Sequence, residues 1–455
     1  NNIITPLIPG PIWRWNPTIA NTNGGQGNWE VASGDTMLPA KGYIVRGPSS
    51  FSPTVPAPLN GTFIGTPNNG IINYTISRGS DQNTTYHQGT NGTEITNFSD
   101  NWNLLGNPYP SAIRGSQFLF NNNTKIEGNI KLWTHGTLPS IIASPFYNSY
   151  LYNYSPGDYL TYNFTGTSCC PAAASDLFIG AGQGFFVQMI DGPAGSDTVT
   201  FDNNLRSASY DNSLFYRMST PLTQTNSTFD VNTLERNRIW LDLISSNNQS
   251  DRTLFGYIEG ATMGRDSFFD SQTLKTGSMS IYSLINSDKF LIQGRQLPFD
   301  VYDEVPIGIH LQNSGSYDIG IGGLDGIFTT QNIYLKDKEL DIIHDLKVSP
   351  YRFSAQNGTI NNRFKIVYLN GSLNNNDISL NNNIAVITNE NIVIRSSNEK
   401  LHSITVFDVL GRNLGVYKDI NSTEFTIKNL LKNNTALFLQ IKLENGVIKN
   451  EKIIF

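Results

Sequence analysis

The chain has 455 residues and a mass of 50.4 kDa, enough for about three or four domains that each bury their own core. Its net charge is −6 and it contains no basic run, which argues against a nucleic acid partner. No stretch of about 18 apolar residues occurs, so we expect no segment that spans a bilayer. Charged residues make up only 15%, against roughly 25% in an average soluble domain, and polar uncharged residues replace them.

Short runs of alternating apolar and polar residues recur along the whole chain, separated by Gly, Asn, Asp, Ser and Pro. Long runs with apolar residues three and four positions apart, the pattern of an amphipathic helix, do not occur. The sequence therefore predicts an all-β fold, built from several antiparallel β-sandwich modules in series.

The N-terminal part of the chain contains a weak internal repeat. The sequence KGYIV at 41–45 is similar to QGFFV at 183–187, and a short strand ending in Trp precedes each of them. We therefore expect one β module over residues 1–95 and a second copy over residues 96–215. The second copy opens with a segment at 101–110 that the first copy lacks, so we expect the chain to begin partway through a domain.

A third module is expected over residues 216–370. The sequences RIWLDL at 238–243 and TLFGYI at 253–258 have the β-branched and aromatic content of strands. Further runs of the same kind follow at short intervals up to residue 368. This density of strands predicts an antiparallel sandwich that resembles a jelly roll.

The last 85 residues, 371–455, have the clearest β pattern. A strand is expected where Leu437, Leu439, Ile441 and Leu443 alternate with other residues. The dipeptide Asn445-Gly446 follows, and we expect a two-residue hairpin turn there because both residue types accept positive φ angles. Upstream runs bring the total to about seven strands, which is typical of a small immunoglobulin-like sandwich.

Segments in this tail resemble the type C C-terminal sorting domains of proteins that Bacteroidetes export by the type IX secretion system. The matching segments are NIVI at 391–394, VFDVLGR at 406–412, EFTIKNL at 424–430, ENG at 444–446 and KIIF at 452–455. The segment NNTAL at 433–437 departs from the wording often found there. Upstream segments around 106–111, 182–187, 238–241 and 303–308 resemble other modules of the same proteins.

The resemblance implies export across the outer membrane to the cell surface or the extracellular space. It implies two partners, the type IX secretion translocon and its outer-membrane shuttle protein. It assigns the sorting signal to the motifs of the tail. The residues concerned are Val409, Leu410, Gly411, Arg412, Asn445, Gly446 and Lys452.

We expect a secreted, cell-surface, adhesin-like protein whose tail acts as export and anchoring signal. One alternative is the non-catalytic C-terminal region of a secreted polysaccharide-degrading enzyme. Another is a glycan-binding module that stacks sugars on Trp13, Trp15 and Trp29. Because Trp13 and Trp15 share one strand face, a place in the core is the favoured interpretation for both.

Residues with catalytic or metal-binding potential do not form a recognisable site, so we expect no enzyme activity. The five His residues are widely spread, and no phosphate-binding or nucleophile-elbow motif is present. The acidic residues Asp266, Asp270, Asp300, Asp303 and Glu304 cluster in two loops without the marks of a catalytic pair.

No cofactor is expected either, and calcium in an oxygen-rich loop is the one alternative left open. The two cysteines, Cys169 and Cys170, are adjacent. Three states of these cysteines remain open, namely free thiols, a vicinal disulfide, or disulfide pairing with another segment.

Overall fold

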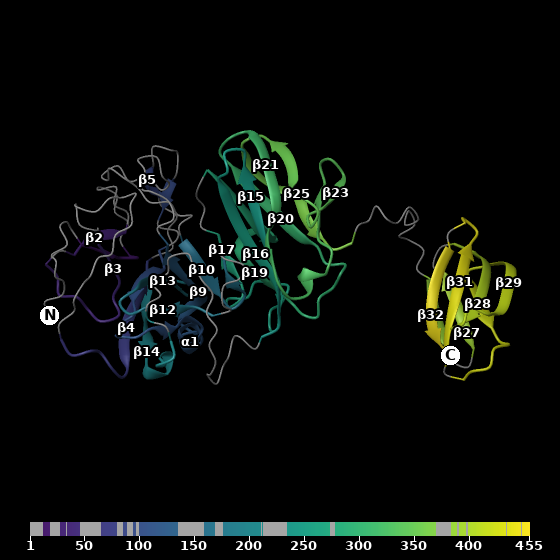
Figure 1. Cartoon of the computed structure of the whole chain (residues 1–455), viewed down its shortest axis with the longest axis horizontal. Coiled ribbons are helices and arrows are strands. Elements are labelled where there is room, and N and C mark those ends of the chain that lie inside the picture. The colour runs from purple at the N-terminus through teal and green to yellow at the C-terminus, as the bar shows by residue number, and fades with distance from the viewer. Residues whose placement is uncertain are drawn as a thin grey trace. The chain divides into compact units, whose positions relative to one another are not determined.

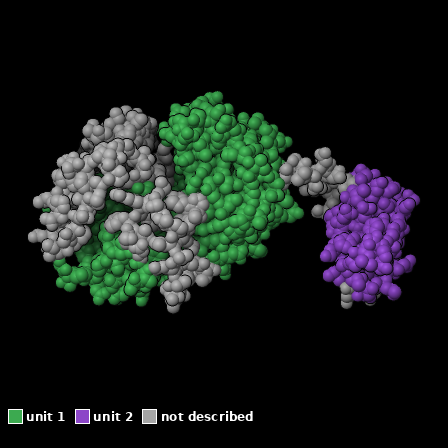
Figure 2. All heavy atoms as spheres, in the orientation of Figure 1, with its two compact units in different colours: residues 1–370 green, residues 371–455 purple. Residues whose placement is uncertain are grey.

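The structure is a computed structural model. In it the chain forms two compact units, residues 1–370 and residues 371–455 (Figures 1 and 2). It describes residues 12–18, 28–32, 34–45, 65–79, 85–88, 94–96, 100–134, 159–168, 176–210, 212, 234–273, 278–369, 384–388, 391–396, 399–433, 435–446 and 448–455. Almost all regular structure in these residues is β-strand, and the one α-helix among them, α1, is Gly115–Asn121. The predicted all-β fold is confirmed.

The N-terminal part of the first unit is built around a five-stranded antiparallel sheet of order β11-β10-β9-β13-β7. Its strands are β7 (Trp102–Gly106), β9 (Ile126–Trp133), β10 (Tyr159–Asn163), β11 (Gly166–Thr167) and β13 (Gly184–Met189). Smaller sheets pair β1 (Trp13–Trp15) with β2 (Trp29–Val31) and β3 (Tyr43–Ile44), β4 (Ile72–Arg78) with β14 (Gly195–Phe201), β5 (Thr85–Gln88) with β6 (Glu94–Thr96), and β8 (Ile113–Arg114) with β12 (Phe178–Ile179).

One hydrophobic core includes described residues from both expected repeats. Strand β4 pairs with β14 over seven residues, which joins segments from the two expected repeats in one sheet. Ala40 and Ile76 belong to the same buried cluster as Ile130, Leu132 and Phe185. Residues on both sides of the boundary expected between 95 and 96 therefore contribute to a single core.

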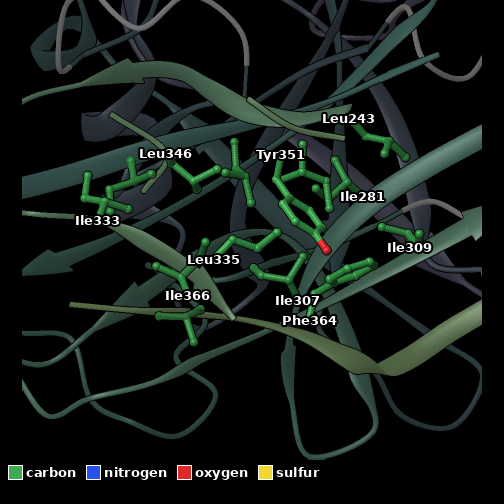
Figure 3. Close-up of a cluster of buried hydrophobic side chains, with 14 of the residues drawn as sticks. Leu243, Ile281, Ile307, Ile309, Ile333, Leu335, Leu346, Tyr351, Phe364 and Ile366 are labelled. Atoms are coloured by element: carbon green, nitrogen blue, oxygen red, sulfur yellow. The ribbon is translucent and has the colours of Figure 1, made fainter. Parts of the chain in front are cut away.

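The second part of this unit is one continuous sheet of eleven strands that bends around its own core. The strands are β15 (Arg236–Ser245), β16 (Ser250–Ile258), β17 (Ser271–Gln272), β18 (Met279–Ile285), β19 (Asp288–Arg295), β20 (Val305–Leu311), β21 (Gly315–Leu324), β22 (Tyr334–Asp337), β23 (Ile342–Asp345), β24 (Tyr351–Ala355) and β25 (Gly358–Val367). All pairings are antiparallel except β16 with β19. Side chains from strands far apart in sequence, such as Leu243, Ile307 and Phe364, meet in this core (Figure 3).

The hairpin formed by β10 and β11 joins the two parts of the first unit. The indole N–H of Trp240 donates to the carbonyl of Thr167 at 3.0 Å, and Arg238 donates to the carbonyl of Thr165 at 3.1 Å. The ring of Phe164 stacks on that of Phe268, with 4.6 Å between the centroids. Because these groups are buried or nearly so, the hairpin tip fixes the two parts against each other.

The second unit contains seven strands among its described residues. Three form the sheet β26 (Ile384–Thr388), β27 (Ile392–Ser396) and β30 (Glu424–Ile427), and four form the sheet β28 (Leu401–Asp408), β29 (Asn413–Ser422), β31 (Ala436–Leu443) and β32 (Ile448–Ile454). Inner side chains of both sheets, including Ile394, Val406 and Leu439, share one buried cluster. Across the described residues of the chain, no helix is long and apolar enough to cross a membrane.

Two Arg–Asp ion pairs in the second part of the first unit test how much the buried junction contributes to stability. Arg238 is buried, pairs with Asp325 at 2.6 and 2.8 Å, and also bonds Thr165, whereas Arg352 is exposed and pairs only with Asp318 at 2.9 Å. We expect Arg238→Met to lower the free energy of unfolding by about 3 kcal/mol, because it leaves Asp325 and the Thr165 carbonyl without this partner.

Arg352→Met is the matched control and should change the free energy of unfolding by less than about 1 kcal/mol, because its ion pair is exposed to solvent. Urea titrations of both variants provide the measurement. Equal effects would contradict the assigned role of Arg238 at the junction.

Candidate functional site

A tight turn after β28 carries four of the residues assigned to the sorting signal, and Asp408 organises it. Its carboxylate accepts hydrogen bonds from the backbone N–H groups of Leu410 and Arg412, each at 2.9 Å, and from the Arg412 side chain at 2.6 Å. Gly411 has a φ of +76°, a conformation that favours glycine. Desolvation alone raises the pKa of Asp408, but the hydrogen bonds from Arg412 and Leu410 outweigh it and hold the pKa below its usual value.

The turn holds two apolar side chains in solvent. Val409 is 64% exposed and Leu410 is 75% exposed. Because the neighbouring backbone groups are tied to Asp408, these side chains are displayed on an ordered turn. An ordered display of apolar groups is the kind of surface that a partner recognises.

Next to this turn, the outer side of the four-stranded sheet also carries exposed apolar residues. Strand alternation directs Val406, Leu437 and Leu439 into the core and their neighbours outward. We name the exposed apolar residues that face outward at the turn end of this sheet the apolar sheet face. Its members are Leu414, Val416, Phe438 and Ile454.

The structure separates the sorting-signal residues into two groups. Lys452 is exposed and lies opposite Phe438 on β32, so it belongs with the turn and the apolar sheet face. The hairpin with Asn445 and Gly446 connects the other ends of β31 and β32, beside the start of β28, where Glu444 bonds Lys400. A strand of eight residues separates the two groups by roughly 25 Å.

The hairpin forms at the expected place, but its turn differs from the expectation. The N–H of Gly446 bonds the carbonyl of Leu443 at 3.0 Å, so Glu444 and Asn445 are the central residues of the turn. Gly446 has a φ of +87°, whereas Asn445 does not have a positive φ. The expected two-residue turn with two positive φ angles is therefore wrong, because a single glycine supplies the left-handed residue that closes the hairpin.

The three Trp residues, which we expected either in the core or in a sugar-binding platform, differ in their burial. Trp13 is buried, whereas Trp15 and Trp29 are half-buried and pack edge-on against each other with 5.0 Å between ring centroids. Both rings also contact Phe186 on β13. The aromatic group of this region therefore lies on the outer side of the five-stranded sheet, and it includes Phe186 from the second expected repeat.

One group of acidic residues identified in the sequence borders a cavity of about 420 Å³. Both oxygens of Asp303 are bound by Arg295, one of them also by Tyr257, and Glu304 pairs with Lys365. Asp300 accepts the N–H of Tyr302. Within the described part of the chain, no group of three or more His, Cys, Asp or Glu residues could hold a metal ion.

The other pair of acidic residues, Asp266 and Asp270, forms hydrogen bonds within the fold. Asp270 accepts hydrogen bonds from the N–H groups of Gly294 and Asp266, and Asp266 accepts one from Thr262. Burial raises the pKa of Asp270 to about 7. Cys169 and Cys170 lie outside the described residues.

Two family models cover the chain. A domain of unknown function (DUF8693) matches residues 2–368, and a second domain of unknown function (DUF8694) matches residues 373–455. The chain belongs to the DUF8693 family. No curated protein matches it. The division between the DUF8693 and DUF8694 regions lies beside the division between the two compact units.

Asp270 gives the DUF8693 region a testable pH dependence. In the folded state this carboxyl keeps its proton up to pH of about 7, whereas an unfolded chain loses it near 3.8. The folded state therefore binds more protons between these values, so its stability falls as pH rises, by at most about 1.4 kcal/mol per pH unit.

We expect Asp270→Asn to remove this contribution, so that the difference in melting temperature between native protein and variant changes steadily from pH 4 to pH 7. Thermal unfolding scans across this range measure the difference. A difference that stays constant with pH would show that Asp270 is ionised in the folded state.

Proposed function

We propose that the chain is a cell-surface protein exported by the type IX secretion system, with residues 378–455 as its export and anchoring signal. The observation that supports the proposal is that two features lie side by side in the DUF8694 region. The motif residues Val409, Leu410 and Lys452 lie at the end of the sheet that also bears the apolar sheet face.

Recognition of a folded signal fits the construction of this region. Residues 371–455 form a compact unit with its own core, so the unit is suited to being presented as one body. Its exposed apolar side chains are not needed by that core, because the inward residues of β28 and β31 already fill it. Apolar groups that a small unit leaves in solvent favour a binding role.

We infer that the translocon or its outer-membrane shuttle contacts the apolar sheet face together with Val409 and Leu410. Such a contact removes apolar surface from water on both partners. Backbone pairing with an edge strand is a second mode, since β29 and β32 form the edges of the four-stranded sheet. The first mode depends on side chains, whereas the second depends mainly on backbone groups, and this difference makes them separable.

The DUF8693 region would then be the part displayed outside the cell. Buried hydrogen bonds join its two β parts into one compact unit, which suits a spacer or an adhesion module. We propose an adhesin-like role for it, and a non-catalytic role in a larger secreted polysaccharide-degrading protein as the alternative. Comparing the adhesion of cells with and without the displayed region tests the first role.

The export proposal predicts a specific defect for the double variant Val409→Ser and Leu410→Ser in a host with a type IX secretion system. Both side chains are exposed, so the variant should fold normally. We expect surface delivery to fall at least tenfold and the protein to accumulate inside the cell envelope, as in a deletion of residues 378–455. Immunoblots of surface and envelope fractions measure the distribution.

Val348→Ser is the matched control, because Val348 is equally apolar and is 80% exposed but lies outside the proposed signal. It should be delivered like the native protein. Normal surface delivery of the deletion would reject the export signal itself. Normal delivery of the double variant alone would reject the apolar contact and leave edge pairing as the mode of recognition.

A further inference from the structure

Three exposed lysines point outward from the four-stranded sheet of the second unit, whose strands β28, β29, β31 and β32 are labelled in Figure 1. Lys418 on β29 and Lys442 on β31 both lie opposite Ser403 of β28, so they belong to one row across the sheet. These two lysines are two strands apart, which is about 10 Å. Lys452 on β32 lies opposite Phe438, in the part of the sheet that bears the apolar sheet face.

Among the described residues, none of these three lysines has an acidic partner. The positions directly opposite them hold Ser403, Ile448 and Phe438, although an acidic residue at such a position would stabilise the sheet. Other cations of the same unit do form ion pairs, namely Arg395 with Glu424, Arg412 with Asp408 and Lys449 with Glu451. The outward face of this sheet therefore carries positive charge that its own fold does not neutralise.

A row of mainly polar, uncharged residues lies between the lysine row and the apolar sheet face. Thr405 is opposite Gln440, and Gln440 is opposite Asn450. Gln440 and Asn450 are exposed. Along the strands, the outward face thus changes from apolar at the turn end, through polar residues, to basic at the row of Lys418 and Lys442.

This order of chemistry fits a protein partner better than a lipid surface. A protein interface has an apolar centre and a polar rim, and it holds hydrogen-bonding and charged groups at fixed positions. A lipid surface attracts cations and apolar side chains without requiring any order among them. The whole chain also carries a net charge of −6, which opposes its adsorption to an anionic lipid surface.

We propose that the protein surface that covers the apolar sheet face carries acidic residues where it meets Lys418 and Lys442. This inference rests on the proposed export role and specifies the chemistry of the partner, which is the translocon or its shuttle. Charge pairing at the rim of an apolar contact orients the two proteins, speeds their encounter and excludes partners with a basic rim. The contact therefore weakens as the salt concentration rises.

Charge reversal of the lysine row tests the proposal in a host with a type IX secretion system. We expect Lys418→Glu combined with Lys442→Glu to lower surface delivery of the whole chain at least tenfold, because like charges then face each other. Lys418→Arg with Lys442→Arg keeps the charge and should be delivered normally. Lys418→Gln with Lys442→Gln should give an intermediate loss. Immunoblots of surface and envelope fractions measure delivery, and melting temperatures of the purified variants report on folding.

Lys338→Glu with Lys428→Glu is the matched control, because it changes the net charge equally at exposed positions outside the four-stranded sheet. It should be delivered like the native protein. Normal delivery of a folded Glu variant of the lysine row, or an equal loss in the control, would overturn the acidic contact. If that Glu variant fails to fold, normal delivery of the Gln variant overturns it instead. Normal delivery of a chain without residues 378–455 is a different result, because it rejects the export role itself.

Cosedimentation with lipid vesicles distinguishes a protein partner from a lipid surface. The probes are vesicles of phosphatidylcholine alone and of phosphatidylcholine mixed with phosphatidylglycerol, at low salt concentration. We expect the native chain to remain in solution with both. Binding to the anionic vesicles that is lost in the Glu variant of Lys418 and Lys442 would assign these lysines to a lipid surface and overturn the proposal.

Discussion

A β-strand directs alternate side chains to two faces, and a core covers only one of them. This constraint determines both compact units. In the four-stranded sheet of the second unit, Val406, Leu439 and Ile441 fill the core, which leaves Phe438 outside. In the five-stranded sheet of the first unit, Ile130 and Leu132 fill the core, which places Lys131 on the other side, where it is also buried. In the second unit, the features of functional interest therefore lie on the face that the core does not use.

The apolar sheet face, with Val409 and Leu410 beside it, offers apolar contact area without buried polar groups that demand a partner. Such a surface fits a partner protein that associates through apolar burial.

The core-facing strand residues were predictable from the sequence, because alternation is a local pattern. The alternating Leu and Ile residues from 437 to 443 are buried as their spacing predicts. The closing turn was predictable only in part, since Asn445-Gly446 indicates a hairpin but several turn geometries use the same dipeptide. The segment IKLW at 130–133 was recognisable as a strand, yet nothing in it indicates that its lysine is buried.

Long-range pairing explains what the sequence did not reveal. Lys131 is buried between Phe186 and Thr161, which lie far from it in the chain. The pairing of β4 with β14 likewise connects segments more than a hundred residues apart. The sequence repeat predicts two consecutive modules and therefore does not indicate that they share one core. The Asp408 turn is the opposite case, because all its hydrogen bonds are local. Its sequence could have identified Asp408 as the residue that orders Val409 and Leu410.

The central claim is that the second unit is a complete, transferable export signal that acts through its folded surface. The most direct measurement fuses residues 371–455 to the C-terminus of an unrelated periplasmic reporter and follows the reporter in a host with a type IX secretion system. The account predicts that the reporter reaches the cell surface with the native unit and stays in the periplasm with a unit carrying Phe438→Ser and Ile454→Ser. A reporter that remains in the periplasm with the native unit would contradict the account.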